Sequence, residues 1–550
     1  MTRYAWRRVA LGTIFILAGL LRIAATYPVF NQVYDEPFTI SCGMEWLDQH
    51  VYRHDPKHPP LGRVLAALPL YLSGKRGAGE HDPRVEGTAL LGTGREYWRN
   101  LGSARAALLP FFVLACIVVW RWAAWAAGAG AGLLAVFVFT NLPAVLGNAG
   151  LAMTDMPLAS AVAAALLLFC LWLEKPGIRR AVLLGLACGL AVLCKFTSLV
   201  FLGFSCPALL VLFVWLGKAE KQIAQRLKGV AVAVFCASLL VWAGYRFSFH
   251  SFGVEKAAAH LSGFDVPDWN PPAPVTAQEN LAGYLRYKAQ VLPVPAPELL
   301  VGLGQLWRHN HEPEPNYFLG EASYRGWFYF YPIILAVKTP LSILLLCAAG
   351  LAVTRRPDWR KLSACAVFAA VLTAGLLSHV NTGIRHVLVV YLPLSVLTAM
   401  AGVALARSSK GGLFATLCAA GLLVESGLAH PDYMAWFNAA VDGKSGEFGV
   451  DTDLDYGQDL ARLVQECERR GVRGLKLSYH GTAAPEALGL TSYEKLLPGT
   501  PQTGWVAISI YHQKLSGSGF AWLEEYEPVV IAGSSIRLYH IPAKQESNPS

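Results

Sequence analysis

The sequence is dominated by long apolar runs that recur along its first 428 residues. A helix needs about 20 consecutive apolar residues to cross the roughly 30 Å hydrocarbon core of a bilayer. Eleven runs come close to this length: residues 9–26, 104–122, 129–147, 156–173, 180–194, 198–217, 229–247, 328–353, 362–378, 387–406 and 412–428. The chain is therefore predicted to be a polytopic α-helical membrane protein with about eleven transmembrane helices.

The composition agrees with this prediction. Apolar residues make up 54% of the chain and charged residues only 15%, whereas soluble domains contain about a quarter charged residues. The net charge of +9 does not indicate nucleic-acid binding, because Lys and Arg are confined to short segments between the apolar runs. Nine of the eleven cysteines lie within apolar runs and none forms a CxxC pair, so we expect buried free thiols.

The distribution of Lys and Arg predicts the orientation. Seventeen Lys and Arg residues lie in the N-terminal segment and in the short segments expected on the same side of the membrane as the N-terminus. The short loops expected on the opposite side contain only Lys195 and Arg385. Cytoplasmic loops carry such an excess of positive charge. We expect a cytoplasmic N-terminus, a first run retained as a span in the cell (inner or plasma) membrane, and three long extracytoplasmic segments at 27–103, 248–327 and 429–550.

The last of these segments has the patterning of a soluble domain. Leu460–Arg470 predicts an amphipathic helix that ends at Gly471, and Leu475–Tyr479 and Val506–Tyr511 predict strands. Residues 529–531 and 536–541 predict a hairpin. The expected organisation is a transmembrane catalytic domain at 1–428 and a soluble extracytoplasmic α/β domain at 429–550.

Polar residues of unusual type collect at the predicted extracytoplasmic boundary. They come from five separate stretches of chain and include Asp35, Glu36, His58, Arg63, Asp155, Lys195, Arg385 and His386. In a transporter, ionisable residues would instead mark a path through the middle of the bilayer. Because these residues are all expected at the same membrane boundary, the sequence predicts a catalytic cleft on the extracytoplasmic side.

Each residue also has a purely structural interpretation. Asp35-Glu36 could be a solvated loop end, and Arg63 and Lys195 could be interfacial anchors. His58 could cap the turn at Pro59-Pro60, Asp155 could be a helix N-cap, and Arg385-His386 could anchor the tenth span. Within the eighth run, Lys338 is either a phosphate ligand or a snorkelling residue at a kink, and Glu425 is expected to be structural.

Two paired motifs carry a resemblance to a known family. Tyr34-Asp35-Glu36 after the first span and His58-Pro59-Pro60-Leu61-Gly62-Arg63 resemble the protein O-mannosyltransferases of family 39 of the GT-C glycosyltransferases. They are also similar to the related aminoarabinose transferases that modify lipid A. Thr154-Asp155-Met156-Pro157 is similar to the family's second acidic position, and the stretch 381–386 resembles a late motif of bacterial members. Arg63 departs from the pattern, because Lys is usual there.

The resemblance implies roles for these residues. Asp35 is expected to act as general base, with Glu36 orienting it or the acceptor. His58, Arg63, Lys195, Arg385 and His386 are expected to bind the phosphate of the donor. Asp155 is the second acidic position, and Asp35 and Asp155 are possible ligands of a divalent cation, although the sequence identifies no cofactor.

The resulting hypothesis is a GT-C membrane glycosyltransferase. It would transfer a sugar from a polyprenyl-phosphate donor to a hydroxyl of a lipid, glycan or protein acceptor on the extracytoplasmic face, with inversion at the anomeric carbon. Two alternatives from other classes remain at this point: a secondary transporter, which predicts internal repeats and charges at the middle of the bilayer, and a non-catalytic scaffold that presents the C-terminal domain.

Overall fold

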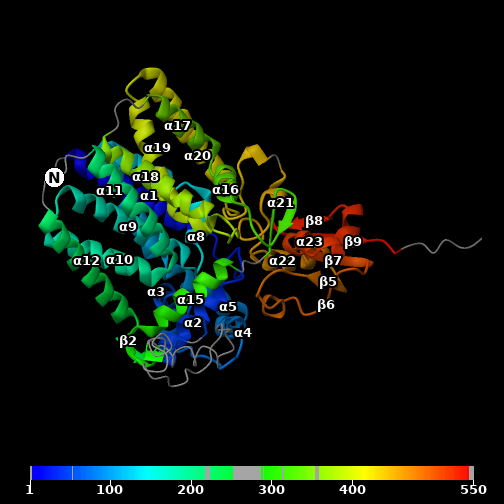
Figure 1. Cartoon of the computed structure of the whole chain (residues 1–550). Coiled ribbons are helices and arrows are strands. Elements are labelled where there is room, and N and C mark those ends of the chain that lie inside the picture. Colours follow the sequence, from blue (N-terminus) through cyan, green and yellow to red (C-terminus); the bar gives the residue numbers. More distant parts are fainter. Residues whose placement is uncertain are drawn as a thin grey trace, which may run out of the picture.

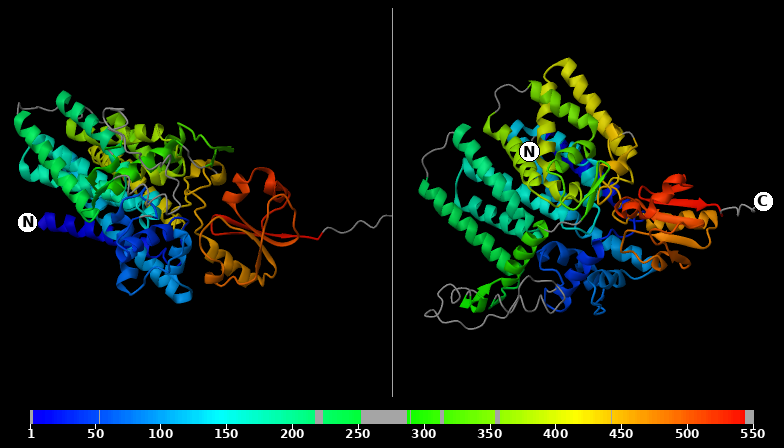
Figure 2. Two further views of the ribbon diagram at one scale, coloured as in Figure 1. Left: turned by 60° about the horizontal axis from the view of Figure 1, so that its bottom comes forward. Right: turned by 45° about the vertical axis from the view of Figure 1, so that its right-hand side comes forward.

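The computed structural model describes residues 3–52, 54–216, 223–251, 287–288, 290–311, 315–353, 358–441 and 443–543. Most of these residues are helical, and strands are concentrated in the C-terminal region. Figure 1 shows a helical bundle with the red and orange C-terminal sheet at one end, and the two views of Figure 2 agree with that arrangement.

The prediction of a multi-pass membrane protein is confirmed. Among the described residues, seven helical segments are long and apolar enough to cross a membrane, or nine if two bent pairs each form one span. The seven correspond to α5–α6 (Gly94–Ala106 and Leu109–Ala127), α9 (Asp155–Glu174), α11 (Thr197–Leu216), α12 (Ile223–Gly244), α18 (Trp359–Leu376), η1–α19 (Ile384–Val390 and Tyr391–Leu405) and α20 (Ser409–Leu428).

The remaining two of the eleven predicted spans also coincide with helices. These are α1 (Arg3–Ala24) and α10 (Ile178–Cys194). Neither is among the seven to nine segments above: α10 has only 17 residues, and α1 contains Arg7, Arg8 and Arg22. The assignment of α1 and α10 as spans therefore stays a prediction.

Two of the predicted spans are bent, and the second bend lies at the kink that the sequence allows beside Lys338. Helices α7 (Ala129–Phe139) and α8 (Pro143–Ala149) meet at 67°, and α16 (Phe330–Lys338) and α17 (Leu341–Val353) meet at 108°. Each bend precedes a proline, Pro143 or Pro340. Proline lacks an amide hydrogen and disfavours helical geometry in the residue before it, and Leu142 and Thr339 are accordingly extended.

Four helices follow α1 in the first long segment: α2 (Glu36–Asp48), α3 (Pro60–Leu72), α4 (Pro83–Leu91) and α5. Two glycines let α2 lie close to its neighbours. A Cβ atom at Gly43 would come within 2.1 Å of the Arg63 carbonyl oxygen, and one at Gly87 within 1.9 Å of the Pro37 carbonyl oxygen. The close packing of α3 and α4 against α2 places Asp35, at the start of α2, among these helices.

The second long segment is described in part. It contains β1 (Phe249–Ser251) paired with β2 (Pro293–Pro295), α15 (Pro297–His311), and β3 (Asn316–Phe318) paired with β4 (Glu321–Ser323). Residues 252–286, 289 and 312–314 of the predicted loop 248–327 lie outside the described part of the chain.

The C-terminal region forms a five-stranded mixed sheet in the order β6-β5-β7-β9-β8. Its strands are β5 (Leu475–Ser478), β6 (Tyr493–Lys495), β7 (Gly504–Ser509), β8 (Val530–Ala532) and β9 (Ile536–Ile541). The predicted helix is present as α22 (Leu460–Arg470) and ends at Gly471 in a left-handed conformation. The hairpin prediction is confirmed by the antiparallel pairing of β8 with β9. Strand β6 was not predicted.

Candidate active site

Asp35 lies at the N-terminus of α2, where the chain turns after α1. Its Oδ2 atom accepts a hydrogen bond of 2.5 Å from the hydroxyl of Tyr456 and lies 3.3 Å from Nη2 of Arg385. The side chain remains 29% exposed. Asp35 is therefore held from two sides and still accessible to a reactant.

Arg385 links Asp35 to a second carboxylate. Its Nη1 atom lies 3.7 Å from Oδ2 of Asp155, and Oδ1 of Asp155 accepts a 2.6 Å hydrogen bond from Nζ of Lys195. Asp155 begins α9, Lys195 follows α10 and Arg385 lies in η1. Four residues predicted from distant segments thus form one network, Asp35–Arg385–Asp155–Lys195, which we call the charge network.

Two atoms of the charge network have unused hydrogen-bonding capacity. Oδ2 of Asp155 and Nε of Arg385 are buried and have no hydrogen-bond partner among the residues that the structure describes. Lys195 and Asp155 are almost completely buried, which does not fit the interpretation of Lys195 as an exposed interfacial anchor. A partly unsatisfied set of buried charges is expected where a polar ligand completes the hydrogen bonding.

The environment of Asp35 keeps it ionised. Burial would raise the pKa of Asp35, but the Arg385 guanidinium and the hydrogen bond from Tyr456 outweigh this effect, so the pKa lies below its ordinary value. Asp35 is consequently a carboxylate at neutral pH, the form that can accept a proton.

His58 and Arg63 are joined by a residue that the sequence analysis did not single out, Asp55. The Asp55 carboxylate is hydrogen bonded to Arg63 and lies 3.1 Å from Nδ1 of His58. Arg63 also donates to the Asp55 carbonyl oxygen at 2.9 Å, and its side chain is buried, so it is not a surface anchor. The acid lies between His54 and His58 in the sequence, a position that could have drawn attention to it.

His58 lies near the charge network, but its side chain is uncharged whereas the members of the network are ions. Its imidazole interacts electrostatically with Asp35 and Lys195. Burial lowers the pKa of His58 to about 4, against the opposing hydrogen bond to Asp55. At neutral pH His58 is therefore uncharged, and any contribution to phosphate binding would come from hydrogen bonding.

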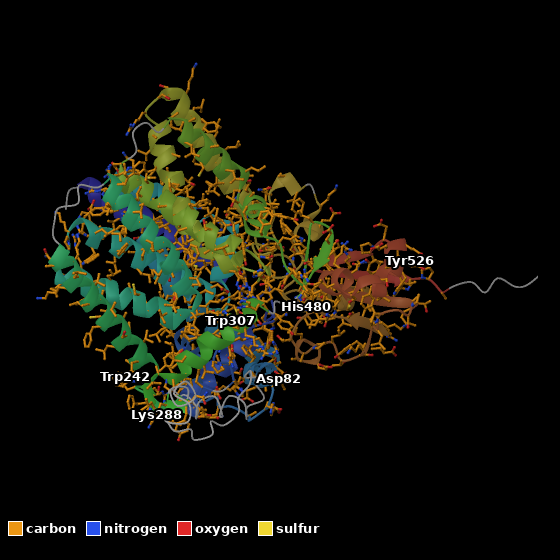
Figure 3. The ribbon with its side chains drawn as sticks, viewed as in Figure 1. Asp82, Trp242, Lys288, Trp307, His480 and Tyr526 are labelled. Atoms are coloured by element: carbon orange, nitrogen blue, oxygen red, sulfur yellow. The ribbon has the colours of Figure 1, made fainter. Side chains whose placement is uncertain are left out.

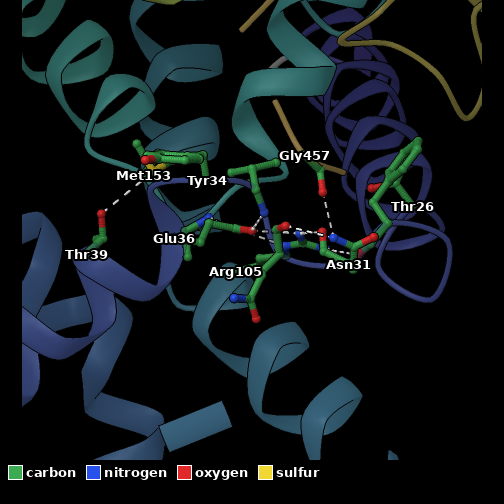
Figure 4. A network of polar contacts seen from close by, with 12 residues as sticks. Thr26, Asn31, Tyr34, Glu36, Thr39, Arg105, Met153 and Gly457 are labelled. Carbon is green, nitrogen blue, oxygen red and sulfur yellow. Dashed lines mark hydrogen bonds and ion pairs between the residues drawn. The ribbon is translucent and has the colours of Figure 1, made fainter. Parts of the chain in front are cut away.

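Glu36 points toward Arg105 and is completely buried (Figure 4). Its carboxylate is paired with Nε and Nη2 of Arg105, both at 2.8 Å, and accepts hydrogen bonds from the amides of Val33 and Ala152 at 2.9 and 2.8 Å. These contacts tie α2 to α5 and to the turn before α9. They fit a positioning role, and the catalytic role expected for Glu36 stays a prediction.

The other predicted polar residues have structural partners. Nε2 of His386 is hydrogen bonded to Oγ1 of Thr382 at 2.6 Å, within the same turn as Arg385. Lys338, at the bend between α16 and α17, donates to the carbonyl oxygens of Met434 and Asp453. Glu425 accepts from the Leu341 amide at 2.9 Å and caps α17, in agreement with the structural role expected for it.

Asp35 and Asp155 were also expected as possible ligands of a divalent cation. In the part of the chain that the structure describes, no three His, Cys, Asp or Glu side chains lie together so as to hold a metal ion. The oxygens of Asp35 and Asp155 face Arg385, Lys195 and Tyr456 instead.

The chain is similar to known membrane glycosyltransferases. The family model for dolichyl-phosphate-mannose-protein mannosyltransferase matches residues 42–251, less than half of the chain. The S. cerevisiae protein O-mannosyltransferase Pmt1–Pmt2 complex bound to the sugar donor is 11% identical, with a TM-score of 0.56 over 80% of this chain and 92% of that one. The chain has the GT-C fold. The resemblance inferred from the motifs is thus confirmed.

Two further structures are similar over nearly the whole chain. ArnT from Cupriavidus metallidurans bound to undecaprenyl phosphate is 12% identical, with a TM-score of 0.49 over 98% of each chain. The archaeal oligosaccharyltransferase AglB from Archaeoglobus fulgidus is 12% identical, with a TM-score of 0.49 over 99% of this chain and 75% of that one. No curated protein matches the chain.

Proposed function

We propose that the chain is a membrane glycosyltransferase that uses a polyprenyl-phosphate-linked sugar as donor. The observation that carries the proposal is the charge network, which places the partly exposed Asp35 carboxylate beside Arg385 and connects this pair through Asp155 to Lys195. The matching family model is that of a transferase with a dolichyl-phosphate donor, and the similar Pmt1–Pmt2 structure holds its sugar donor.

The proposed chemistry assigns the proton transfer to Asp35. Its carboxylate removes the proton of the acceptor hydroxyl while that oxygen attacks the anomeric carbon. The bond between the anomeric carbon and the phosphate oxygen breaks, and the polyprenyl phosphate leaves with the electron pair. Attack opposite the leaving group inverts the anomeric centre.

The two cations of the charge network stabilise the leaving phosphate. Arg385 and Lys195 hold fixed positive charge in a buried setting, where such charge acts strongly on a developing anion. A bound phosphate also competes with Asp35 for Arg385. Weaker pairing with Arg385 raises the pKa of Asp35 and makes it a stronger base once the donor is present.

The proposed location is the extracytoplasmic face of the cell membrane, with the N-terminus in the cytoplasm. The distribution of Lys and Arg supports this orientation. A lipid-linked donor is consistent with a site at a membrane boundary, because the phosphate must reach the cations while its tail stays in hydrocarbon. The acceptor is proposed to be a hydroxyl of a lipid, glycan or protein.

Asp35→Asn in the purified full-length protein tests the proposal. The assay measures transfer from a panel of radiolabelled polyprenyl-phosphate sugars, with cell-envelope lipids, glycans and proteins as acceptors. We expect a fall in rate of about 100- to 10,000-fold, the usual contribution of a general base. Asp48→Asn, at the other end of α2, is the matched control and should retain activity.

Two outcomes would contradict the proposal. Full transfer by the Asp35→Asn variant would remove Asp35 as the base. Absence of transfer by the wild-type protein with every donor, together with uptake of a solute into vesicles, would favour a transporter.

A further inference from the structure

The C-terminal region contacts the site through the segment 450–457, which precedes α22. Asp453 accepts hydrogen bonds from the Ile384 amide at 3.2 and 3.1 Å, and Thr452 donates its amide hydrogen to the Thr382 carbonyl oxygen at 3.2 Å. These contacts fix the start of η1. The position of Arg385, one residue after Ile384, therefore depends on the segment 450–457.

Tyr456 in the same segment touches both partners of the Asp35–Arg385 pair. Its hydroxyl donates the 2.5 Å hydrogen bond to Asp35, and its ring lies 4.8 Å from the guanidinium carbon of Arg385. The ring is buried against Val33, Leu151 and Met153. Burial raises the pKa of Tyr456 well above its ordinary value, so the hydroxyl stays protonated and remains a donor.

The loop that leads into Asp35 is held by the same region. The Tyr34 amide donates to the Tyr456 carbonyl oxygen at 2.9 Å. The buried side chain of Asn31 donates to the Gly457 carbonyl oxygen at 2.7 Å (Figure 4). It also accepts from the Ala461 amide at 3.0 Å.

A second contact reaches Tyr34 from the C-terminal sheet. His480 stacks on Tyr34, with ring centroids 4.9 Å apart, and on Tyr511 at 3.7 Å. Figure 3 shows His480 at the junction between the sheet and the helices. The hydroxyl of Thr482 also donates to the Tyr34 carbonyl oxygen at 3.2 Å.

We propose that the C-terminal region completes the active site, and that Tyr456 is a positioning residue that orients the Asp35 carboxylate with its hydroxyl and supports Arg385 with its ring. The catalytic meaning of this inference rests on the proposed function, whereas its structural content does not. The alternative is an interface that only holds the C-terminal region in place. In that case Tyr456 would not affect the pH at which Asp35 binds a proton.

The protonation of Asp35 distinguishes these possibilities. Removing the Tyr456 hydroxyl takes away a hydrogen bond that favours the carboxylate, so Asp35 should bind a proton at higher pH. The other groups that act on Asp35 stay in place in such a variant: Arg385 from η1, Arg84 from α4, His58 before α3, and His480 from the C-terminal sheet.

The experiment measures labelling of Asp35 by a carbodiimide, which reacts with the protonated carboxyl group. The full-length protein in detergent is labelled over a range of pH, and modification of Asp35 is quantified by peptide mass spectrometry. Tyr456→Phe keeps the ring under Arg385 and should shift the labelling midpoint upward by about one pH unit, the effect of a hydrogen bond to a charged group.

Tyr479→Phe is the matched control. The Tyr479 hydroxyl donates to the Gly457 carbonyl oxygen in the same interface and has no hydrogen bond to Asp35. This variant should leave the midpoint unchanged. As a second variant, 3-fluorotyrosine at position 456 has a more acidic hydroxyl, which strengthens the hydrogen bond and should shift the midpoint downward without altering the packing.

Equal midpoints in the wild type, Tyr456→Phe and the fluorotyrosine protein would overturn the inference, as would equal shifts in Tyr456→Phe and Tyr479→Phe. Labelling requires no sugar donor. A shift confined to position 456 therefore supports the positioning role even if no sugar is transferred. Failure of the proposed function would be seen in the transfer assay and not in the labelling.

Discussion

Replacing Glu36 with Gln shows whether the buried acid next to Asp35 stabilises the fold or takes part in the reaction. Glu36 is surrounded by four donors at 2.8–2.9 Å, two from Arg105 and two from the amides of Val33 and Ala152. Gln has nearly the same size, but its amide nitrogen is a donor. Its one oxygen cannot serve all four groups, and the charge of Arg105 loses its counterion.

The expected cost follows from this geometry. Glu36 and Arg105 are both almost completely inaccessible to water, and breaking a buried ion pair by removing one partner costs about 3–5 kcal/mol. We expect Glu36→Gln to lower the free energy of unfolding by an amount in that range. Transfer per folded molecule should fall far less than in Asp35→Asn.

The measurement is denaturant unfolding of the purified protein in detergent, followed by circular dichroism. The control is the double variant Glu36→Met with Arg105→Met. It leaves no unpaired charge buried, so it should recover the part of the loss that comes from the unpaired charge of Arg105, but not the part from the Val33 and Ala152 amides, which lose their acceptor. A loss below about 1 kcal/mol in Glu36→Gln would refute the reasoning, because a typical single hydrogen bond already contributes that much. A stable variant with activity as low as Asp35→Asn would instead support the catalytic role predicted from the sequence.

Two further predictions concern the surroundings of the site. The pKa of His58 is about 4 in the fold and 6.5 ordinarily, so the unfolded chain binds more protons between these values and stability falls as the pH is lowered through this window. His58→Gln should therefore flatten the pH dependence of unfolding from pH 6.5 to 4, and an unchanged slope would contradict the burial of a neutral imidazole. Glu425→Gln weakens the cap of α17 and should cost about 1 kcal/mol of unfolding free energy without changing transfer; a loss of transfer would show that the bend at Pro340 serves the reaction.

The eleven apolar runs and the C-terminal strand pattern could be predicted because they depend on local sequence. A run of apolar residues must form a helix in lipid, and its ends are marked by charge and aromatic residues within a few positions. For the same reason Asp35, Asp155, Lys195 and Arg385 could be assigned to one boundary, since each lies at the end of a run. The kink that the sequence allows at Lys338 in the eighth run is present as the bend before Pro340, whereas the bend before Pro143 was not predicted.

Only the tertiary structure decided which charges pair. Two adjacent acids, Asp35 and Glu36, point to different partners, and Arg105 takes Glu36 while Arg385 takes Asp35. Tyr456 reaches Asp35 across 421 positions of sequence. Pairing of this kind depends on the packing of elements far apart in the chain, and a buried charge is stable only beside the partner that packing supplies.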